Sequence, residues 1–308
     1  MRTFAANLII FAAFAGIGHS LSAVAHAQDK EETIRVDSSV VLVGVSVTDR
    51  AGKAVTGIKK SEFSILDNGV VRPLSIFAAE STPFAAIILV DTSGSMGDRV
   101  SVARGAAIAF LDRTRVEDVV AIYSFDSAVK LISDFDRTRM EQPESFFKMK
   151  ADGMTVLNDA IVAAANVLNG RPEKRRAIVV LSDGADTRSK NTAERAIKAA
   201  SDAGANIYTV DLSSIDDNGI EVMRARSALR NFAEKSGGTF VASPNGSTVR
   251  EAFRVIAEEL GNQYTLGFEP DERALDGKFH PIEVRISRPG LTIRSRKGYY
   301  AGKRGSGL

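Results

Sequence analysis

The sequence predicts an α/β domain with a doubly wound, mostly parallel sheet, inserted into a β-sandwich that the two flanking segments form together. Three observations support this prediction. Short apolar runs such as Phe84–Val90 and Ala177–Leu181 alternate with helical patterns between residues 82 and 262. Residues 33–79 and the residues from 263 onward show a period of two, which is typical of half-buried strands. Each flank is too short to form a domain alone, so pairing of the flanks is the simplest arrangement.

The composition excludes several classes of site. The chain has 308 residues, which suggests about two domains. Its 40 basic and 38 acidic side chains leave a net charge of +2, which gives no general argument for binding nucleic acid or an anionic membrane. The chain has no cysteine, so disulfides, thiolate metal sites and cysteine nucleophiles are excluded.

Residues 1–27 have the pattern of a secretory signal peptide. Arg2 precedes the apolar run Phe4–Gly18, and Ala25-His26-Ala27 has the small-x-small form of a cleavage site. The apolar run is short for a membrane span of about 20 residues, so we expect cleavage rather than an uncleaved anchor. The mature chain would then begin at Gln28, have no stable membrane span and lie in the periplasm or outside the cell. His280 would be its one remaining histidine.

The first flank is predicted to contain three strands. Val41, Val43, Val45 and Val47 alternate with smaller or more polar residues, as in a half-buried strand. Phe63–Leu66 and Val70–Phe77 are two more expected strands. Asp67-Asn68-Gly69 lies between them and predicts a hairpin, because Asn-Gly tolerates the positive φ of a type I′ turn.

The central segment alternates helices with strands. The predicted strands are Phe84–Val90, Val119–Phe125, Ala177–Leu181 and Asn206–Leu212, and the predicted helical stripes start near Ala103, Leu157, Asn191 and Val249. The period of two returns in Tyr264–Phe268, Ile282–Ile286 and Leu291–Ile293. The predicted boundaries are therefore 28–81 for the first part of the sandwich, 82–262 for the α/β domain, and 263–308 for the second part and tail.

Oxygen-bearing side chains gather at the predicted ends of three elements. Asp91, Ser93 and Ser95 directly follow the strand Phe84–Val90, and ligands of open α/β sheets bind beyond the carboxyl ends of strands. Thr155 precedes a helix, and Asp183 follows the strand Ala177–Leu181. Carboxylates and hydroxyls suit Mg²⁺, Mn²⁺ or Ca²⁺ and are poor ligands for zinc or copper.

This pattern resembles the metal-ion-dependent adhesion site of von Willebrand factor type A domains, over about residues 82–262. Met154 stands where many members of that family have glycine. The flanks resemble an Acidobacteria-type family of exported proteins that carry this domain, through Val45–Asp49, Phe63–Gly69 and Lys297–Tyr300. The resemblance implies that one divalent cation, Mg²⁺ with Mn²⁺ or Ca²⁺ as alternatives, is held, in part through water, by Asp91, Ser93, Ser95, Thr155 and Asp183.

The resulting functional hypothesis is an exported protein-binding module for adhesion or scaffolding, whose cation is completed by an acidic residue of a protein partner. The alternatives are a metal-dependent hydrolase or phosphotransferase, and a structural envelope protein whose metal only stabilises the fold. The sequence favours a non-enzymatic role, because it has no P-loop, no Gly-x-Ser-x-Gly around Ser95 and no apparent general base.

Other charged residues have simpler interpretations. Asp159 is a candidate acceptor behind the metal ligands or a favourable charge at a helix N-terminus. Asp98 and Asp186 are expected to be solvated loop charges, and His280 a surface residue. Arg294 and Arg296 are expected on the solvent side of an edge strand, where they deter aggregation rather than bind nucleic acid.

Overall fold

The computed structural model describes residues 40–79, 82–136, 144–184, 186–214, 219–242, 246–271 and 276–302. The expected signal peptide, residues 1–27, lies outside these described residues, so its cleavage stays a prediction. Within the described ranges, no helix is long and apolar enough to cross a membrane.

The centre of the fold is a six-stranded sheet with the order β10-β9-β8-β5-β6-β7. Every neighbouring pair is parallel except β6 and β7, which are antiparallel. The sheet is therefore the mostly parallel, doubly wound sheet that the sequence predicts. Its strands are β5 (Phe84–Asp91), β6 (Val119–Phe125), β7 (Val129–Asp136), β8 (Arg175–Ser182), β9 (Ala205–Asp211) and β10 (Phe240–Ala242).

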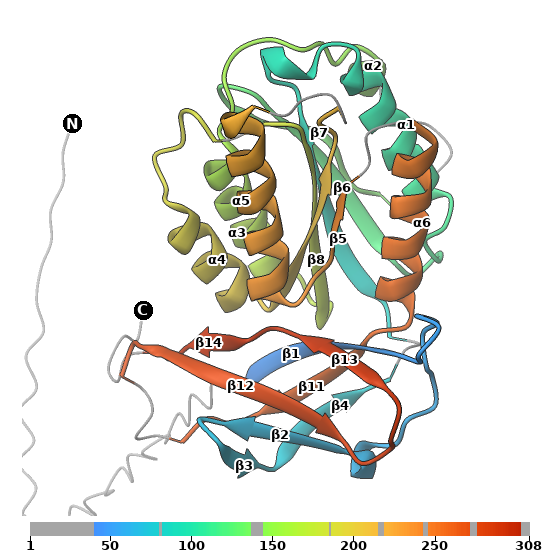
Figure 1. Cartoon of the computed structure of the whole chain (residues 1–308), viewed down its shortest axis with the longest axis vertical. Helices are drawn as coiled ribbons and strands as arrows, with labels where there is room; N and C mark the ends of the chain where they lie inside the picture. The colour runs from blue at the N-terminus through green and yellow to red at the C-terminus, as the bar shows by residue number, and fades with distance from the viewer. Residues whose placement is uncertain are drawn as a thin grey trace, which may run out of the picture. The chain divides into compact units, whose positions relative to one another are not determined.

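Helices cover both faces of this sheet, and β5 is accordingly apolar from Phe84 to Val90 (Figure 1). Alternate residues such as Phe84 and Ile88 pack with α1 and α6, whereas Ile87 and Leu89 pack with α3, α4 and α5 on the other face. Two apolar cores thus hold β5 rigidly and fix the position of its last residue, Asp91. The helices are α1 (Arg99–Leu111), α2 (Glu144–Phe147), α3 (Leu157–Asn169), α4 (Ala193–Asp202), α5 (Ile220–Ser236) and α6 (Gly246–Gly261).

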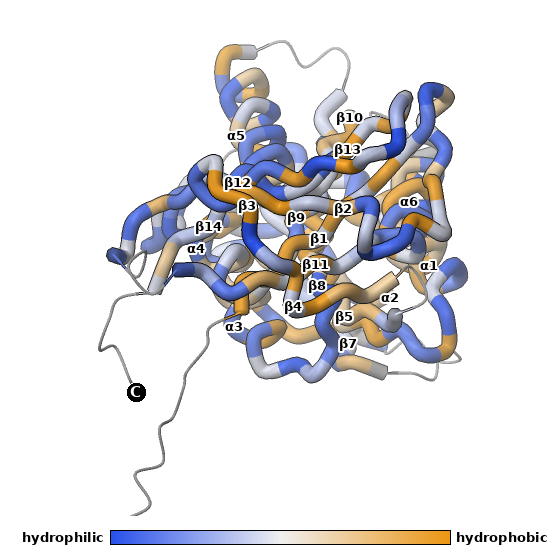
Figure 2. Tube along the Cα trace, turned by 90° about the horizontal axis from the view of Figure 1, so that it is seen from below, coloured by the Kyte–Doolittle hydropathy of each residue, from blue (hydrophilic) through white to orange (hydrophobic). Residues whose placement is uncertain are grey.

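The two flanks form one β-sandwich. Its sheets have the orders β13-β1-β11-β4 and β14-β12-β2-β3, so strands from both flanks contribute to each sheet. The α/β segment is accordingly inserted between the two parts of the sandwich, as predicted. Hydrophobic residues alternate with hydrophilic ones along β12 (Figure 2). The strands are β1 (Val41–Thr48), β2 (Phe63–Asp67), β3 (Val70–Arg72), β4 (Leu74–Ala78), β11 (Tyr264–Phe268), β12 (Phe279–Ile286), β13 (Thr292–Ser295) and β14 (Gly298–Tyr300).

The sandwich differs from the sequence prediction at Pro73. The expected single strand Val70–Phe77 is divided there into β3, which pairs with β2, and β4, which pairs with β11 in the other sheet. Proline has no amide hydrogen to donate to a ladder, which makes it a natural point for a strand to change sheets. The predicted turn before it is confirmed, with φ of 50° at Asn68 and 80° at Gly69.

Glu259 of α6 joins the α/β domain to the sandwich. Its Oε1 accepts hydrogen bonds from the Ser46 hydroxyl of β1 at 2.7 Å and from the Tyr208 hydroxyl of β9 at 3.0 Å. Its Oε2 accepts from Thr239 and contacts the Arg294 guanidinium of β13. The expectation that Arg294 is a purely solvated charge is therefore wrong, because its guanidinium reaches a carboxylate at the joint between the domains.

His280 is buried, and the expectation of a surface residue is wrong. It is 6% exposed, and its Nδ1 lies 2.6 Å from the Asn68 side-chain nitrogen. Its Nε2 lies 3.0 Å from Oδ1 of Asp276. The ring is thus a buried hydrogen-bonding element of the sandwich, because β12 turns His280 toward the interior between the exposed residues Phe279 and Pro281.

Candidate functional site

Asp91 is the last residue of β5, and it anchors the turn that leads to α1. Its Oδ1 accepts a hydrogen bond from the Ser93 backbone N–H at 2.8 Å. Its Oδ2 accepts from the Ser182 hydroxyl of the adjacent strand β8 at 2.5 Å. The side chain is fully buried. The carboxylate therefore organises its own turn and ties that turn to the neighbouring strand end.

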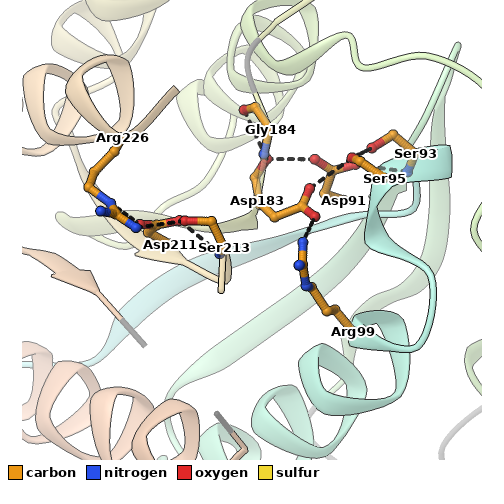
Figure 3. Close-up of polar contacts among 10 residues, drawn as sticks. Asp91, Ser93, Ser95, Arg99, Asp183, Gly184, Asp211, Ser213 and Arg226 are labelled. Carbon is orange, nitrogen blue, oxygen red and sulfur yellow. Dashed lines mark hydrogen bonds and ion pairs between the residues drawn. The ribbon is translucent and has the colours of Figure 1, made fainter. Parts of the chain in front are cut away.

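The hydroxyls that follow Asp91 lead directly to the second carboxylate (Figure 3). The Oγ atoms of Ser93 and Ser95 lie 3.1 Å apart, and the Ser95 hydroxyl donates to Oδ1 of Asp183 at 2.8 Å. Asp183 comes directly after β8, which pairs in parallel with β5. The structure thus brings together four predicted residues from two neighbouring strand ends.

Thr155 reaches the same place from the loop before α3. That loop is bound to the Asp91 turn, since Gly94 N–H donates to the Gly153 carbonyl at 3.0 Å. A Cβ built on Gly184 would lie 3.5 Å from the Ser95 Oγ and 3.8 Å from the Thr155 Oγ1. Both hydroxyls therefore border the small space that the missing side chain of Gly184 leaves, so Thr155 lies beside the group that Asp91, Ser93, Ser95 and Asp183 form.

The site holds two carboxylates, Asp91 and Asp183, and the Arg99 guanidinium contacts one of them. Burial is the main cause that raises the pKa of Asp91 to about 6; the nearby Asp183 carboxylate acts in the same direction, and hydrogen bonds from Ser182 and Ser93 act against it. Arg99, at the start of α1, contacts the Asp183 carboxylate and supplies a positive charge from one side. Arg99 is one-third exposed and resembles an ordinary surface residue of a helix, so the sequence did not indicate that it belongs to the site.

The carboxylates alone do not form a metal site. In the part of the chain that the structure describes, no three side chains from histidine, cysteine, aspartate and glutamate gather so that they could hold a metal ion. Any cation at this edge of the sheet would need the serine and threonine oxygens as well as Asp91 and Asp183. Such a donor set is compatible with a hard cation that retains water ligands.

Comparison with known proteins finds a family match within the α/β segment. The family model described as von Willebrand factor type A domain matches residues 86–185. This segment includes all five predicted site residues. The resemblance inferred from the sequence is therefore confirmed for residues 86–185.

More distant similarities extend beyond this segment. An uncharacterized protein from Synechocystis sp. is 22% identical over 184 residues, which cover 58% of this chain and 42% of that protein. The chain thus matches less than half the length of this relative. A von Willebrand factor type A protein from Catenulispora acidiphila is 14% identical, with a TM-score of 0.49 and coverage of 88% and 76% of the two chains. The vWF domain of a type V pili tip protein from Porphyromonas gingivalis is also 14% identical, with a TM-score of 0.49 and coverage of 58% and 95%.

Asp159 and Asp186 support the loop beside the candidate site. The Asp159 carboxylate accepts backbone hydrogen bonds from Lys190 and Asn191, and these lower its pKa although burial acts in the opposite direction. Asp186 Oδ2 accepts from Asn158 N–H at 2.7 Å and from the Ser189 hydroxyl at 2.5 Å. Asp186 is therefore a structural residue of this loop, and the expectation of a solvated charge is wrong.

A second Asp-x-Ser turn lies at the end of β9, next to β8 (Figure 3). Asp211 Oδ1 accepts from the Ser213 backbone N–H at 2.9 Å, as Asp91 does from Ser93. Here the carboxylate forms an ion pair with Arg226 of α5, whose Nε donates to Asp211 Oδ2 at 2.6 Å. The second carboxylate oxygen is thus bound by a guanidinium in the Asp211 turn, whereas in the Asp91 turn it is bound by the neutral Ser182 hydroxyl.

Proposed function

We propose that the chain is an exported, divalent-metal-dependent protein-binding module. The observation that supports this proposal is the convergence of Asp91, Ser93, Ser95, Thr155 and Asp183 at the carboxyl edge of the type A sheet. The N-terminal pattern of residues 1–27 supports export. The binding role is the one that the resemblance to metal-ion-dependent adhesion sites implies.

The donor set fits a hard divalent cation. All the candidate ligands are oxygens, and the two carboxylates would balance the charge of Mg²⁺, Mn²⁺ or Ca²⁺. Asp91 and Asp183 would hold the ion together with the hydroxyls of Ser93, Ser95 and Thr155. When bound, the ion would supply a Lewis-acidic position that accepts an oxygen ligand from outside the chain. A carboxylate of a partner protein is the ligand that the adhesion-site resemblance implies.

The surroundings favour binding over hydrolysis. His280 is the only histidine among the described residues, and it lies in the sandwich bonded to Asp276. The Arg99 guanidinium, which contacts Asp183, has hydrogen-bond donors and no acceptor, so it does not provide a general base. Met154, directly before Thr155, is 48% exposed and offers an apolar contact beside the ligands. We therefore expect a partner that presents an acidic residue next to an apolar one.

A capture experiment from the envelope fraction of the native host tests the proposal. The full chain is immobilised, and capture is compared in Mg²⁺ and in EDTA. We expect a partner that is retained only in Mg²⁺, and no retention by Asp91→Ala. Asp112→Ala removes an exposed carboxylate at the end of α1 and is the matched control that should capture normally. Partner binding that survives EDTA or the Asp91→Ala change would contradict the proposal.

A further inference from the structure

Arg296 is buried at the joint between the type A domain and the sandwich. The residue lies between β13 and β14, and only 5% of it is exposed. Its Nη1 donates to the Ser201 carbonyl at 2.9 Å and to the Ser201 hydroxyl at 3.1 Å. Ser201 is in the last turn of α4, where the helix dipole favours a positive charge. The guanidinium thus binds the end of α4 through one of its nitrogens.

The positive charge of the Arg296 guanidinium has no close anion within the ranges that the structure describes, and part of its hydrogen-bonding capacity is unused. Its Nε is buried without a hydrogen-bond partner in the described part of the chain. No carboxylate of the described residues forms an ion pair with Arg296, although Asp202 acts on it from farther away. Burial lowers the pKa of the Arg296 guanidinium to about 10. A buried cation without a close anion is unfavourable, so an anion that reaches it would stabilise the fold.

A cavity of about 390 Å³ gives access to Arg296. This volume is in the range of small-molecule sites. Lys235 at the end of α5 and Lys297 next to Arg296 also line it, and Glu194 is the one acidic side chain in its lining. Three cationic groups against one carboxylate favour an anionic ligand.

One wall of this cavity is aromatic. The rings of Phe279 and Tyr300 are 5.4 Å apart and meet edge to face. A Cβ on Gly298 would lie 2.3 Å from the Phe279 ring, so the absence of a side chain at Gly298 lets this ring pack on the backbone. Phe279 is nevertheless 50% exposed. Ile197 adds an aliphatic surface. The ligand should therefore carry an apolar, flat group beside its negative charge.

A neighbouring cavity of about 380 Å³ also touches Arg296, but its other cations are already engaged. Lys198 pairs with Asp202 at 2.6 Å. The Arg176 guanidinium donates to backbone carbonyls, including that of Ala203 at 2.8 Å. Lys235 and Lys297 have no ion pair among the described residues, so the charge available for a ligand lies on the Phe279 side.

We infer that this joint cavity binds a carboxylate attached to a flat apolar group, with the carboxylate at Arg296 and the apolar group against Phe279 and Tyr300. This site is independent of the proposed cation site. The same chemistry could come from a free aromatic acid or from the C-terminal carboxylate of a polypeptide that ends in an aromatic residue. Binding would link the sandwich strand β14 to α4 and α5 of the type A domain.

Titration calorimetry and thermal unfolding of the full chain test the inference with matched probes. Benzoate is compared with neutral benzamide, and the peptide Gly-Gly-Phe is compared with its C-terminal amide. We expect benzoate, the free-acid peptide or both to bind and to raise the melting temperature. The uncharged counterparts should bind at least tenfold more weakly. The tighter of the two acids identifies the source of the ligand.

Variants of the exposed lysines avoid the risk that a substitution at Arg296 prevents folding. Lys235→Gln and Lys297→Gln should each weaken binding severalfold, and the double variant should weaken it at least tenfold. Lys53→Gln removes an exposed lysine that lines none of these cavities and should bind like the wild type. Equal binding of charged and neutral probes, no binding of either acid, or an unaffected double variant would overturn the inference.

Discussion

Arg99 contacts the carboxylate of Asp183 at the edge of the candidate cation site. The Asp183 side chain is almost completely buried, whereas that of Arg99 is partly exposed at the start of α1. The same carboxylate accepts the Ser95 hydroxyl through its other oxygen. A permanent cation thus already neutralises one of the two carboxylates that a divalent ion would use. Arg99 and the ion therefore compete for Asp183.

This competition predicts the behaviour of Arg99→Gln. Removing the guanidinium should raise the affinity for Mg²⁺ by about three- to tenfold, since a partly exposed ion pair contributes roughly 1 kcal/mol. In EDTA the same variant should melt at a lower temperature, because Asp183 loses its counter-charge. Calorimetric titration and melting curves measure the two effects, with Arg99→Lys as the charge-preserving control. Unchanged metal affinity would contradict the competition.

Gly184 provides a steric test of the site. A new Cβ there would meet Ser95 and Thr155 only at ordinary van der Waals distance, so Gly184→Ala should fold normally. It would, however, occupy the space that both hydroxyls border, and metal affinity should fall severalfold. Gly105→Ala on α1, where a Cβ meets nothing within 4 Å, is the matched control. Equal metal affinity of both variants would show that the ion does not use this space.

Arg226 predicts a different response from Arg99. Its guanidinium pairs with the buried Asp211, and removing one partner of a buried pair typically costs about 3–5 kcal/mol. The Arg226 side chain is itself about one-third exposed, so solvent screening reduces the expected loss to roughly 2 kcal/mol. Arg226→Met should lose this stability in urea unfolding and still respond to Mg²⁺. Loss of the Mg²⁺ response in a folded Arg226→Met protein would show that the two turns are coupled.

The pKa of Asp91 sets a pH dependence in the metal-free protein. The folded-state pKa of about 6 exceeds the ordinary aspartate pKa of 3.8, so the folded state binds this proton more tightly than the unfolded state. This group therefore stabilises the fold as pH falls from about 7 to about 4, by up to roughly 3 kcal/mol relative to the ionised form. Asp91→Asn should lose this pH dependence. The check is the difference between the unfolding free energies of wild type and variant across this range in EDTA; a constant difference would contradict the prediction.

The core of the site could be predicted because parallel strand ends meet at one edge of a sheet. Asp91 and Asp183 follow apolar runs, and this pattern places both at strand ends; that the two strands are neighbours is shown only by the structure. The arginines could not be predicted in the same way. Asp211-Leu212-Ser213 repeats the spacing of Asp91-Thr92-Ser93, which could have indicated a second turn. Nothing in that spacing shows that Arg226, on the following helix, forms an ion pair with Asp211.

Local sequence patterns also could not predict which residues are buried in the sandwich and at its joint with the α/β domain. The buried positions of His280 and Arg296 depend on how β12 and the β13–β14 connection pack against distant segments. Alternation along a short strand indicates two faces, but it does not show which face another domain will cover. The change of sheet at Pro73 has a local signal in the proline itself, whereas the pairing of β4 with β11 is set by a strand nearly two hundred residues away.

Calorimetric titration with Mn²⁺ tests the central claim most directly. For the full chain after EDTA treatment, we predict one ion per chain, weaker binding by Ser93→Ala and no binding by Asp91→Ala. The bound ion should stabilise the wild type by about 2.7 kcal/mol at a hundredfold excess over Kd. A wild-type protein that binds no Mn²⁺, or an Asp91→Ala protein that binds it as tightly as the wild type, would contradict a cation site at Asp91.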